Sequence, residues 1–147
     1  MSGQDIHSSR AFPVSRERLY DAFADPAQVA LWWGPAGFTN TIHEFDLRPG
    51  GHWRFTMHGP DGKTYEQDKV FGEIIPAEKV TFRHHAPVHG FLMELSFHDK
   101  GEGSRFDWLM RFDDPGEAET LRNFISKANE ENFDRLQSHL NLHSHPA

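Results

Sequence analysis

The stretch FLMELSFHDKGEGSRFDWLMRF, residues 91–112, decides the fold. Apolar residues occupy every second position from Phe91 to Phe97 and again from Phe106 to Phe112. Such alternation is typical of strands with one buried face. Between the two runs, residues 99–103 (DKGEG) have the composition of a tight turn. The stretch therefore predicts two antiparallel strands joined by a hairpin.

The segment after residues 113–116 (DDPG) changes its apolar period from two to about 3.6, which predicts a helix of roughly seven turns. One helical stripe is formed by Leu121, Phe124, Ile125, Ala128, Asn132, Leu136 and Leu140. A sheet with one apolar face needs a cover, and a long amphipathic helix supplies it.

The residues before this stretch extend the same pattern towards the N-terminus. Strands are predicted at residues 6–14, 43–47, 52–58, 65–75 and 80–86, with turns between consecutive strands from residue 43 onwards. Ser15 is a good N-cap for a short helix from Arg18, and Asp25-Pro26 starts a second that ends at Gly34-Pro35. The sequence thus predicts an α+β fold: a curved antiparallel sheet of six to seven strands, two short helices and a long C-terminal helix. We expect one domain over residues 1–147, with a core at about 6–140 and a frayed tail at 141–147.

Composition narrows the function. The 147 residues include no cysteine, which excludes disulfides, thiolate metal sites and cysteine nucleophiles. The net charge is −7 and no basic block is present, so nucleic acid is not an expected partner. No signal peptide and no apolar run of about 18 residues occur. We therefore expect a cytoplasmic protein without a membrane span.

Several local strings carry a family resemblance. They are FPVSRERLYDAFADP (12–26), LWWGP (31–35), FDLRPGGHWRF (45–55), VFGEIIPAEKV (70–80) and FDRLQSHL (133–140). Together they resemble the family named after the C-terminal domain of the heat-shock chaperone ATPase activator, within the START-like, or SRPBCC, superfamily. The resemblance covers about residues 6–140. It implies the helix-grip fold of START and Bet v proteins, with a cavity for a small ligand. Many members carry Gly-Trp in the last helix, where this chain has Ala128-Asn129.

A ligand cavity is expected between the concave face of the sheet and the long helix. Its candidate lining is Trp32, Trp33, Trp53, Phe55, Met57, Phe82, His84, Phe91, Met93, Leu95, Trp108, Met110, Phe124, Ala128 and Asn129. The alternative is that these side chains only pack the core. Adjacent residues on a helix point about 100° apart, so Trp32 and Trp33 cannot both face inward. The sequence leaves open which of them does.

Titratable candidates are few. His84 and His85 face opposite sides of one strand, so with His89 they do not form a metal site, and no metal or cofactor is expected. His43, His52, His58 and His98 fall on the outward phase, and His143 and His145 lie in the tail. Only His84 shares the phase of Phe82 and is a weak candidate for acid–base chemistry.

Two further groups are predicted to be structural. Residues 48–51 (RPGG) form a turn in which glycine permits a positive φ, and they are a weak phosphate cradle. Glu66 and Asp68 share one face of a strand, but its inward face is ambiguous because Phe71 and Ile74 lie in opposite phases.

Three functions follow as hypotheses. The leading one is a protein that binds a small apolar or amphipathic molecule. The second is a cyclase- or dehydratase-like enzyme that uses the same cavity, in which case a titratable side chain with a perturbed pKa should project into it. The third is a chaperone-linked or protein-interaction module with an exposed apolar patch, for instance around Trp32 or Trp33, through which a homodimer could also form.

Overall fold

The computed structural model describes residues 5–84 and 90–143. Within these ranges the chain forms β1 (Asp5–Phe12), α1 (Arg16–Ala24), α2 (Pro26–Trp32), β2 (Thr39–Phe45), β3 (His52–His58), β4 (Thr64–Ile75), β5 (Lys79–His84), β6 (Phe91–Lys100), β7 (Gly103–Phe112) and α3 (Pro115–His143). The order of elements is the predicted one. Residues 141–143, expected to belong to a frayed tail, continue α3.

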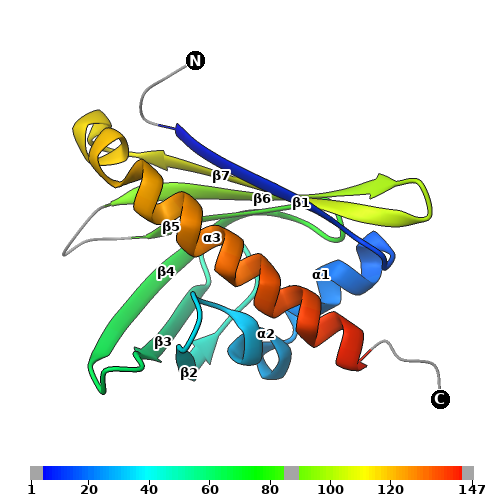
Figure 1. Ribbon diagram of the computed structural model, residues 1–147, viewed down its shortest axis with the longest axis horizontal. Coiled ribbons are helices and arrows are strands. Elements are labelled where there is room, and N and C mark those ends of the chain that lie inside the picture. Colours follow the sequence, from blue (N-terminus) through cyan, green and yellow to red (C-terminus); the bar gives the residue numbers. More distant parts are fainter. Residues whose placement is uncertain (1–4, 85–89, 144–147) are drawn as a thin grey trace.

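All seven strands belong to one antiparallel sheet with the order β1-β7-β6-β5-β4-β3-β2. Strands β2 to β7 form a meander, because each pairs with the next along the chain. The first strand joins at the far edge and pairs with β7, with Phe12 opposite Ser104. The sheet curves around α3, which runs diagonally across its concave side (Figure 1). The α+β helix-grip architecture predicted from the sequence is confirmed.

A bulge in β4 explains the ambiguous phase of that strand. The register shifts between Phe71 and Ile74, and Glu73 N–H donates to Thr81 Oγ1 at 2.8 Å. Gly72 is needed at this point, since a Cβ there would lie 2.7 Å from the same hydroxyl oxygen. Because the bulge adds a residue, Phe71 and Ile74 both pack against the core despite their odd spacing.

The two short helices are joined by one residue that caps both. Asp25 ends α1, and its carboxylate accepts from Ala27 N–H at the start of α2. Ser15 accepts from Arg18 N–H as the N-cap of α1, which therefore begins at Arg16, two residues before the predicted start. The N-caps Ser15 and Asp25 and the proline at residue 26 therefore lie where the sequence predicted them.

One residue of the predicted helical stripe is exposed to solvent. Phe124 is 73% exposed, whereas Ala118, Leu136 and Leu140 are buried. At 3.6 residues per turn, Phe124 points about 120° away from Leu136. The buried face of α3 is therefore narrower than predicted at the N-terminal end of the helix. The remaining apolar members of the stripe lie in the core or pack against it, with Ala128 at the edge of the cavity described below.

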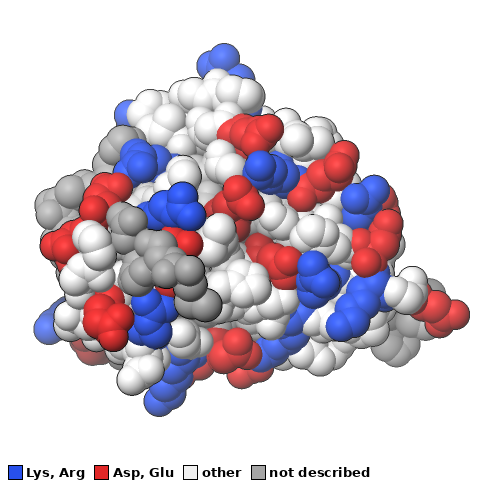
Figure 2. All heavy atoms as spheres, turned by 90° about the horizontal axis from the view of Figure 1, so that it is seen from above, with Lys and Arg blue, Asp and Glu red and all other residues white. Residues whose placement is uncertain are grey.

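The surface carries charges of both signs. Lys and Arg alternate with Asp and Glu over the face shown in Figure 2, so this face offers no continuous basic surface for a nucleic-acid backbone. Among the described residues, no helix is long and apolar enough to cross a membrane.

Candidate functional site

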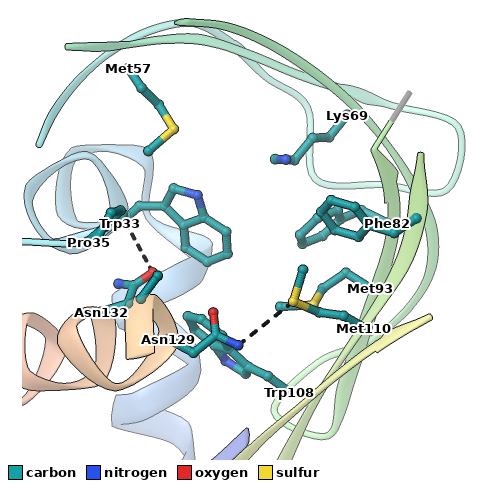
Figure 3. A pocket seen from close by; sticks show the side chains of 13 residues that line it. Trp33, Pro35, Met57, Lys69, Phe82, Met93, Trp108, Met110, Asn129 and Asn132 are labelled. Atoms are coloured by element: carbon teal, nitrogen blue, oxygen red, sulfur yellow. Dashed lines mark hydrogen bonds between the residues drawn. The ribbon is translucent and has the colours of Figure 1, made fainter. Parts of the chain in front are cut away.

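A cavity of about 150 Å³ lies between the concave face of the sheet and α3. We call it the inner cavity (Figure 3). Its walls come from the α2–β2 connection, from strands β3 to β7 and from α3. It is lined by Trp33, Gly34, Pro35, Met57, Lys69, Phe82, Phe91, Met93, Trp108, Met110, Ala128, Asn129 and Asn132. The lining is aromatic and thioether-rich, with a few polar groups among it.

A second hollow of about 310 Å³, the outer groove, adjoins the inner cavity. The two share Phe91, Met110, Ala128 and Asn129. The groove is otherwise lined by His84, Phe112, Leu121, Phe124 and Ile125. The exposed ring of Phe124 therefore lies where the groove meets solvent. Together the hollows form a path from an apolar mouth beside α3 to a more polar interior.

Lys69 is the titratable group of the inner cavity. The alternation of β4 directs Gln67, Lys69 and Phe71 to the concave side, and Lys69 is only 4% exposed. Figure 3 shows its amine pointing inward between Met57 and Phe82. Sequence analysis missed this residue. The phase of Phe71, two positions on, is the signal that could have found it.

Two polar side chains of the described residues lie next to the amine of Lys69. Nζ lies 3.0 Å from His84 Nδ1 and 3.4 Å from Gln67 Oε1. It also faces three aromatic rings, with centroids 5.8 Å (Phe55), 5.2 Å (Phe82) and 5.5 Å (Phe91) away. Within residues 5–84 and 90–143, no carboxylate forms an ion pair with it. Burial is the dominant effect and lowers the pKa of Lys69 to about 7, because the low-dielectric surroundings penalise the ammonium form.

Asn129 contributes a second polar group. Its Nδ2 donates to Ser8 Oγ at 3.1 Å and contacts Met110 Sδ at 3.8 Å. Its carbonyl oxygen points into the cavity, and Asn129 lies across the cavity from Lys69 (Figure 3). Asn129 is buried. It therefore presents a hydrogen-bond acceptor at a position where many members of the family that the sequence resembles carry a tryptophan.

Asn132 and Arg135 hold the rim of the inner cavity. Asn132 accepts from Gly34 N–H at 3.1 Å and donates to Trp32 O at 2.7 Å. Arg135 Nη1 donates to the carbonyls of Trp33, Gly34 and Pro35 at 3.0 to 3.1 Å. These bonds tie α3 to the end of α2, which has no further helical turn to satisfy those carbonyls. Their role is structural.

Both adjacent tryptophans are buried, contrary to the expectation that only one of them could face inward. The 100° rule does not apply to the pair, because α2 ends at Trp32 and Trp33 has an extended backbone with φ −69° and ψ 136°. Trp33 lines the inner cavity, with its ring 5.3 Å from that of Trp108. Trp32 is fully buried elsewhere in the core, and its indole N–H donates to Ala22 O at 2.9 Å. Of the two tryptophans, Trp33 is therefore the one that borders the cavity.

The fifteen candidate lining residues fall into two groups. Eleven border the inner cavity or the outer groove: Trp33, Met57, Phe82, His84, Phe91, Met93, Trp108, Met110, Phe124, Ala128 and Asn129. Four border neither hollow and pack in the core: Trp32, Trp53, Phe55 and Leu95. Phe55 lies directly behind Lys69. A role of the first group in ligand binding stays a prediction.

The histidines are dispersed. His84 is half-buried, stacks on Phe91 with ring centroids 5.0 Å apart, and borders the outer groove. His52 and His98 pair with Asp68 and Asp107 on the outer face. His85 and His89 lie outside the described residues. In the described part of the chain, no three His, Asp or Glu side chains gather as metal ligands do.

Glu66 and Asp68 lie on the convex side of the sheet, away from the cavity. Glu66 accepts from Thr56 Oγ1 at 2.9 Å, and Asp68 pairs with His52 at 3.1 Å. The turn at residues 48–51 is structural as well, because Gly50 N–H and Gly51 O bond to the backbone of Phe71.

Comparison with known proteins gives a family and a fold. The family described as Activator of Hsp90 ATPase homolog 1-like protein matches residues 13–141. A solved structure from Nitrosomonas europaea has a TM-score of 0.89 at 16% identity, covering 98% of each chain. One from Rhodobacter sphaeroides has a TM-score of 0.86 at 20% identity, covering 96% of this chain and 94% of that chain.

A third similar structure is the AHSA1 protein of Silicibacter pomeroyi, with a TM-score of 0.75 at 22% identity, covering 95% of this chain and 99% of that chain. Identities this low support the shared fold and carry no residue roles. No curated protein matches the chain significantly.

Proposed function

The chain belongs to the family of Activator of Hsp90 ATPase homolog 1-like proteins, and we propose that this member binds a small apolar or amphipathic molecule between its sheet and α3. The observation that carries the proposal is the aromatic inner cavity, which opens towards the apolar outer groove. Small-molecule sites are concave, mostly apolar and marked by a few converging polar groups. Lys69 and Asn129 are such groups here.

The dimensions support a ligand larger than the inner cavity alone. A dry cavity of about 150 Å³ accommodates one benzene-sized molecule. With the adjoining groove included, the available space reaches the range of about 300 to 1,000 Å³ that is usual for ligand sites. A molecule with a compact head and an apolar body fits this division.

The experiment is native mass spectrometry of freshly purified protein, followed by titration with a neutral fluorescent probe such as N-phenyl-1-naphthylamine. We expect a bound small molecule or saturable probe binding. Ala128→Phe should block it, because Ala128 borders both hollows. Asn123→Phe is the matched control, since Asn123 is exposed on α3. A clean apo mass together with no saturable probe binding would contradict the proposal.

An enzyme that uses the same cavity is the second candidate, and the Lys69–His84 contact favours it. The two nitrogen atoms are 3.0 Å apart, and the pKa of Lys69 is lowered to about 7 by burial, which suits a group that gives and takes protons near neutral pH. A cyclase or dehydratase would alter the bound molecule with time. Mass spectrometry of the extracted ligand, compared between the wild type and Lys69→Met, separates turnover from simple binding.

A protein-interaction module draws less support. Its proposed patch around Trp32 and Trp33 is not exposed, as these side chains are 0% and 8% accessible. The large apolar residues that are exposed in the described part of the chain lie apart along the sequence, at Leu31, Tyr65, Ile75, Leu92 and Phe124. Single exposed apolar side chains are normal on soluble surfaces.

A further inference from the structure

In the described part of the chain, the buried cation Lys69 has no anionic partner. Its side chain is almost fully enclosed, and the described elements that face it or its cavity include strands β3, β5 and β6 and α3. These elements present Phe55, His84, Phe91 and Asn129 to it or to the cavity it enters. None is a carboxylate, and of the described residues that border either hollow, His84 is the only other titratable side chain. Buried charges in proteins are normally paired, so this amine needs an explanation.

The geometry of the amine leaves one donor position open. An ammonium group has three N–H donors. Among the described residues, two polar atoms, His84 Nδ1 and Gln67 Oε1, lie within reach of Lys69 Nζ. The remaining direction is towards the inner cavity, into which the side chain points (Figure 3). The protein thus offers a hydrogen bond and a positive charge to whatever occupies the cavity.

Building on the proposed function, we propose that the ligand is an amphipathic monocarboxylate, whose head pairs with Lys69 in the inner cavity and whose apolar body follows the outer groove. A carboxylate accepts a short, charge-assisted bond from an ammonium group. The groove walls, built from Phe112, Leu121 and Ile125 among others, supply apolar contact for the body.

The rest of the cavity restricts the ligand to one anionic group. Lys69 is the single amine among the described lining residues, so a dianion would keep uncompensated charge in an apolar site. The carbonyl oxygen of Asn129 faces the cavity from the other side and repels a second carboxylate (Figure 3). Asn129 would accept instead from a hydroxyl or amide of the ligand body.

The pairing has a pH signature. Free Lys69 has its pKa lowered to about 7 by burial, and a bound carboxylate favours the ammonium form. Binding then takes up a proton above pH 7, so affinity should fall by up to tenfold per pH unit there. Between about pH 5.5 and 6.5 the titration of Lys69 should change the affinity little, because Lys69 is mostly charged and the ligand is still ionised in this range. His84, which faces the amine from β5, is the titratable neighbour within residues 5–84 and 90–143 that can modify this profile.

The test is calorimetric or probe-displacement titration with straight-chain carboxylates of six to twelve carbons and with phenylalkanoates, each beside its primary amide. At pH 6.5 we expect a carboxylate to bind about tenfold or more tightly than its amide. The preference should vanish in Lys69→Met and in Lys69→Gln, and persist in Lys63→Met, which removes an exposed lysine. The wild-type pH profile gives a second readout that needs no variant.

Three outcomes would overturn the inference. If acids and amides bind equally and Lys69→Met changes nothing, the cavity binds ligands without an anionic head, and the proposed function stands while the inference falls. If aldehydes or ketones bind in preference and borohydride fixes them on Lys69, the amine acts on carbonyl groups instead. If neither the panel nor the neutral probe binds, the proposed function fails as well.

Discussion

Lys69 and His84 are direct partners across the β4–β5 pair, and their side chains meet on the concave face with Nζ 3.0 Å from Nδ1. Both residues border the candidate site, one in the inner cavity and one in the outer groove. The contact thus links the linings of the two hollows through a hydrogen bond.

Replacing Lys69 with methionine should stabilise the protein, and by more at low pH. The pKa of Lys69 is lowered from 10.5 to about 7, so the unfolded chain binds more protons between these values and folding is penalised there. Below pH 7 both states are protonated and the penalty is complete. As the pH rises towards 10.5 the penalty disappears. The gain in unfolding free energy should therefore be about 2 kcal/mol smaller at pH 9 than at pH 7.

Denaturant unfolding at the two pH values checks this difference. Lys63→Met is the control, since Lys63 is exposed in the β3–β4 connection, and its effect should be the same at both. An equal gain for Lys69→Met at pH 7 and pH 9 would show that the lysine keeps its ordinary pKa.

His84→Phe should lower the pKa of Lys69 further. The ring of phenylalanine can still stack on Phe91, but it offers no acceptor to the ammonium group. NMR titration of the Lys69 side chain measures the shift. His58→Phe changes a histidine that bonds Thr41 on β2, and it should leave Lys69 unchanged. A rise in the pKa after His84→Phe would mean that His84 opposes the charge.

Asn132→Ala should destabilise the fold by about 2 to 4 kcal/mol, because it leaves Gly34 N–H and Trp32 O without their partner in a buried setting. Thermal or denaturant unfolding measures the cost. Asn123→Ala, on the exposed face of the same helix, should stay within about 0.5 kcal/mol. Equal effects of the two substitutions would show that the rim of the cavity does not depend on Asn132.

The two tryptophans should separate binding from stability. Trp33→Phe should weaken probe binding several-fold, since Trp33 lines the inner cavity. Trp32→Phe should leave binding nearly intact but cost about 1 to 3 kcal/mol, because Ala22 O loses its donor. Probe titration and denaturant unfolding of both variants are the measurements. Loss of probe binding by Trp32→Phe alone would reverse the assignment.

Phe124→Ser should have almost no effect on stability, within about 0.5 kcal/mol, because the ring is 73% exposed. It should weaken the binding of long ligands more than that of short ones, since Phe124 borders only the outer groove. Titration with six- and twelve-carbon carboxylates makes the comparison. An equal loss for both lengths would place the ligand body elsewhere.

Local patterns in the sequence determined most of the fold. The alternation in residues 91–112 and the 3.6-residue period after it predicted the hairpin and the covering helix, because each pattern reports which positions are buried within a single element. Ser15, Asp25 and Pro26 likewise marked the helix starts, since capping depends on neighbours in the chain.

Only the tertiary structure decided which inward side chains border a hollow and which fill the core. Trp53, Phe55 and Leu95 share the inward phase with Met57 and Met93, yet they lie behind the cavity, because sheet curvature and the path of α3 set the space above each residue. The sequence did not predict the position of Lys69 either, for two further reasons. Its phase was hidden by the bulge after Phe71, and its low pKa arises from Phe82, Phe91 and the other walls that surround it, which belong to strands distant in sequence.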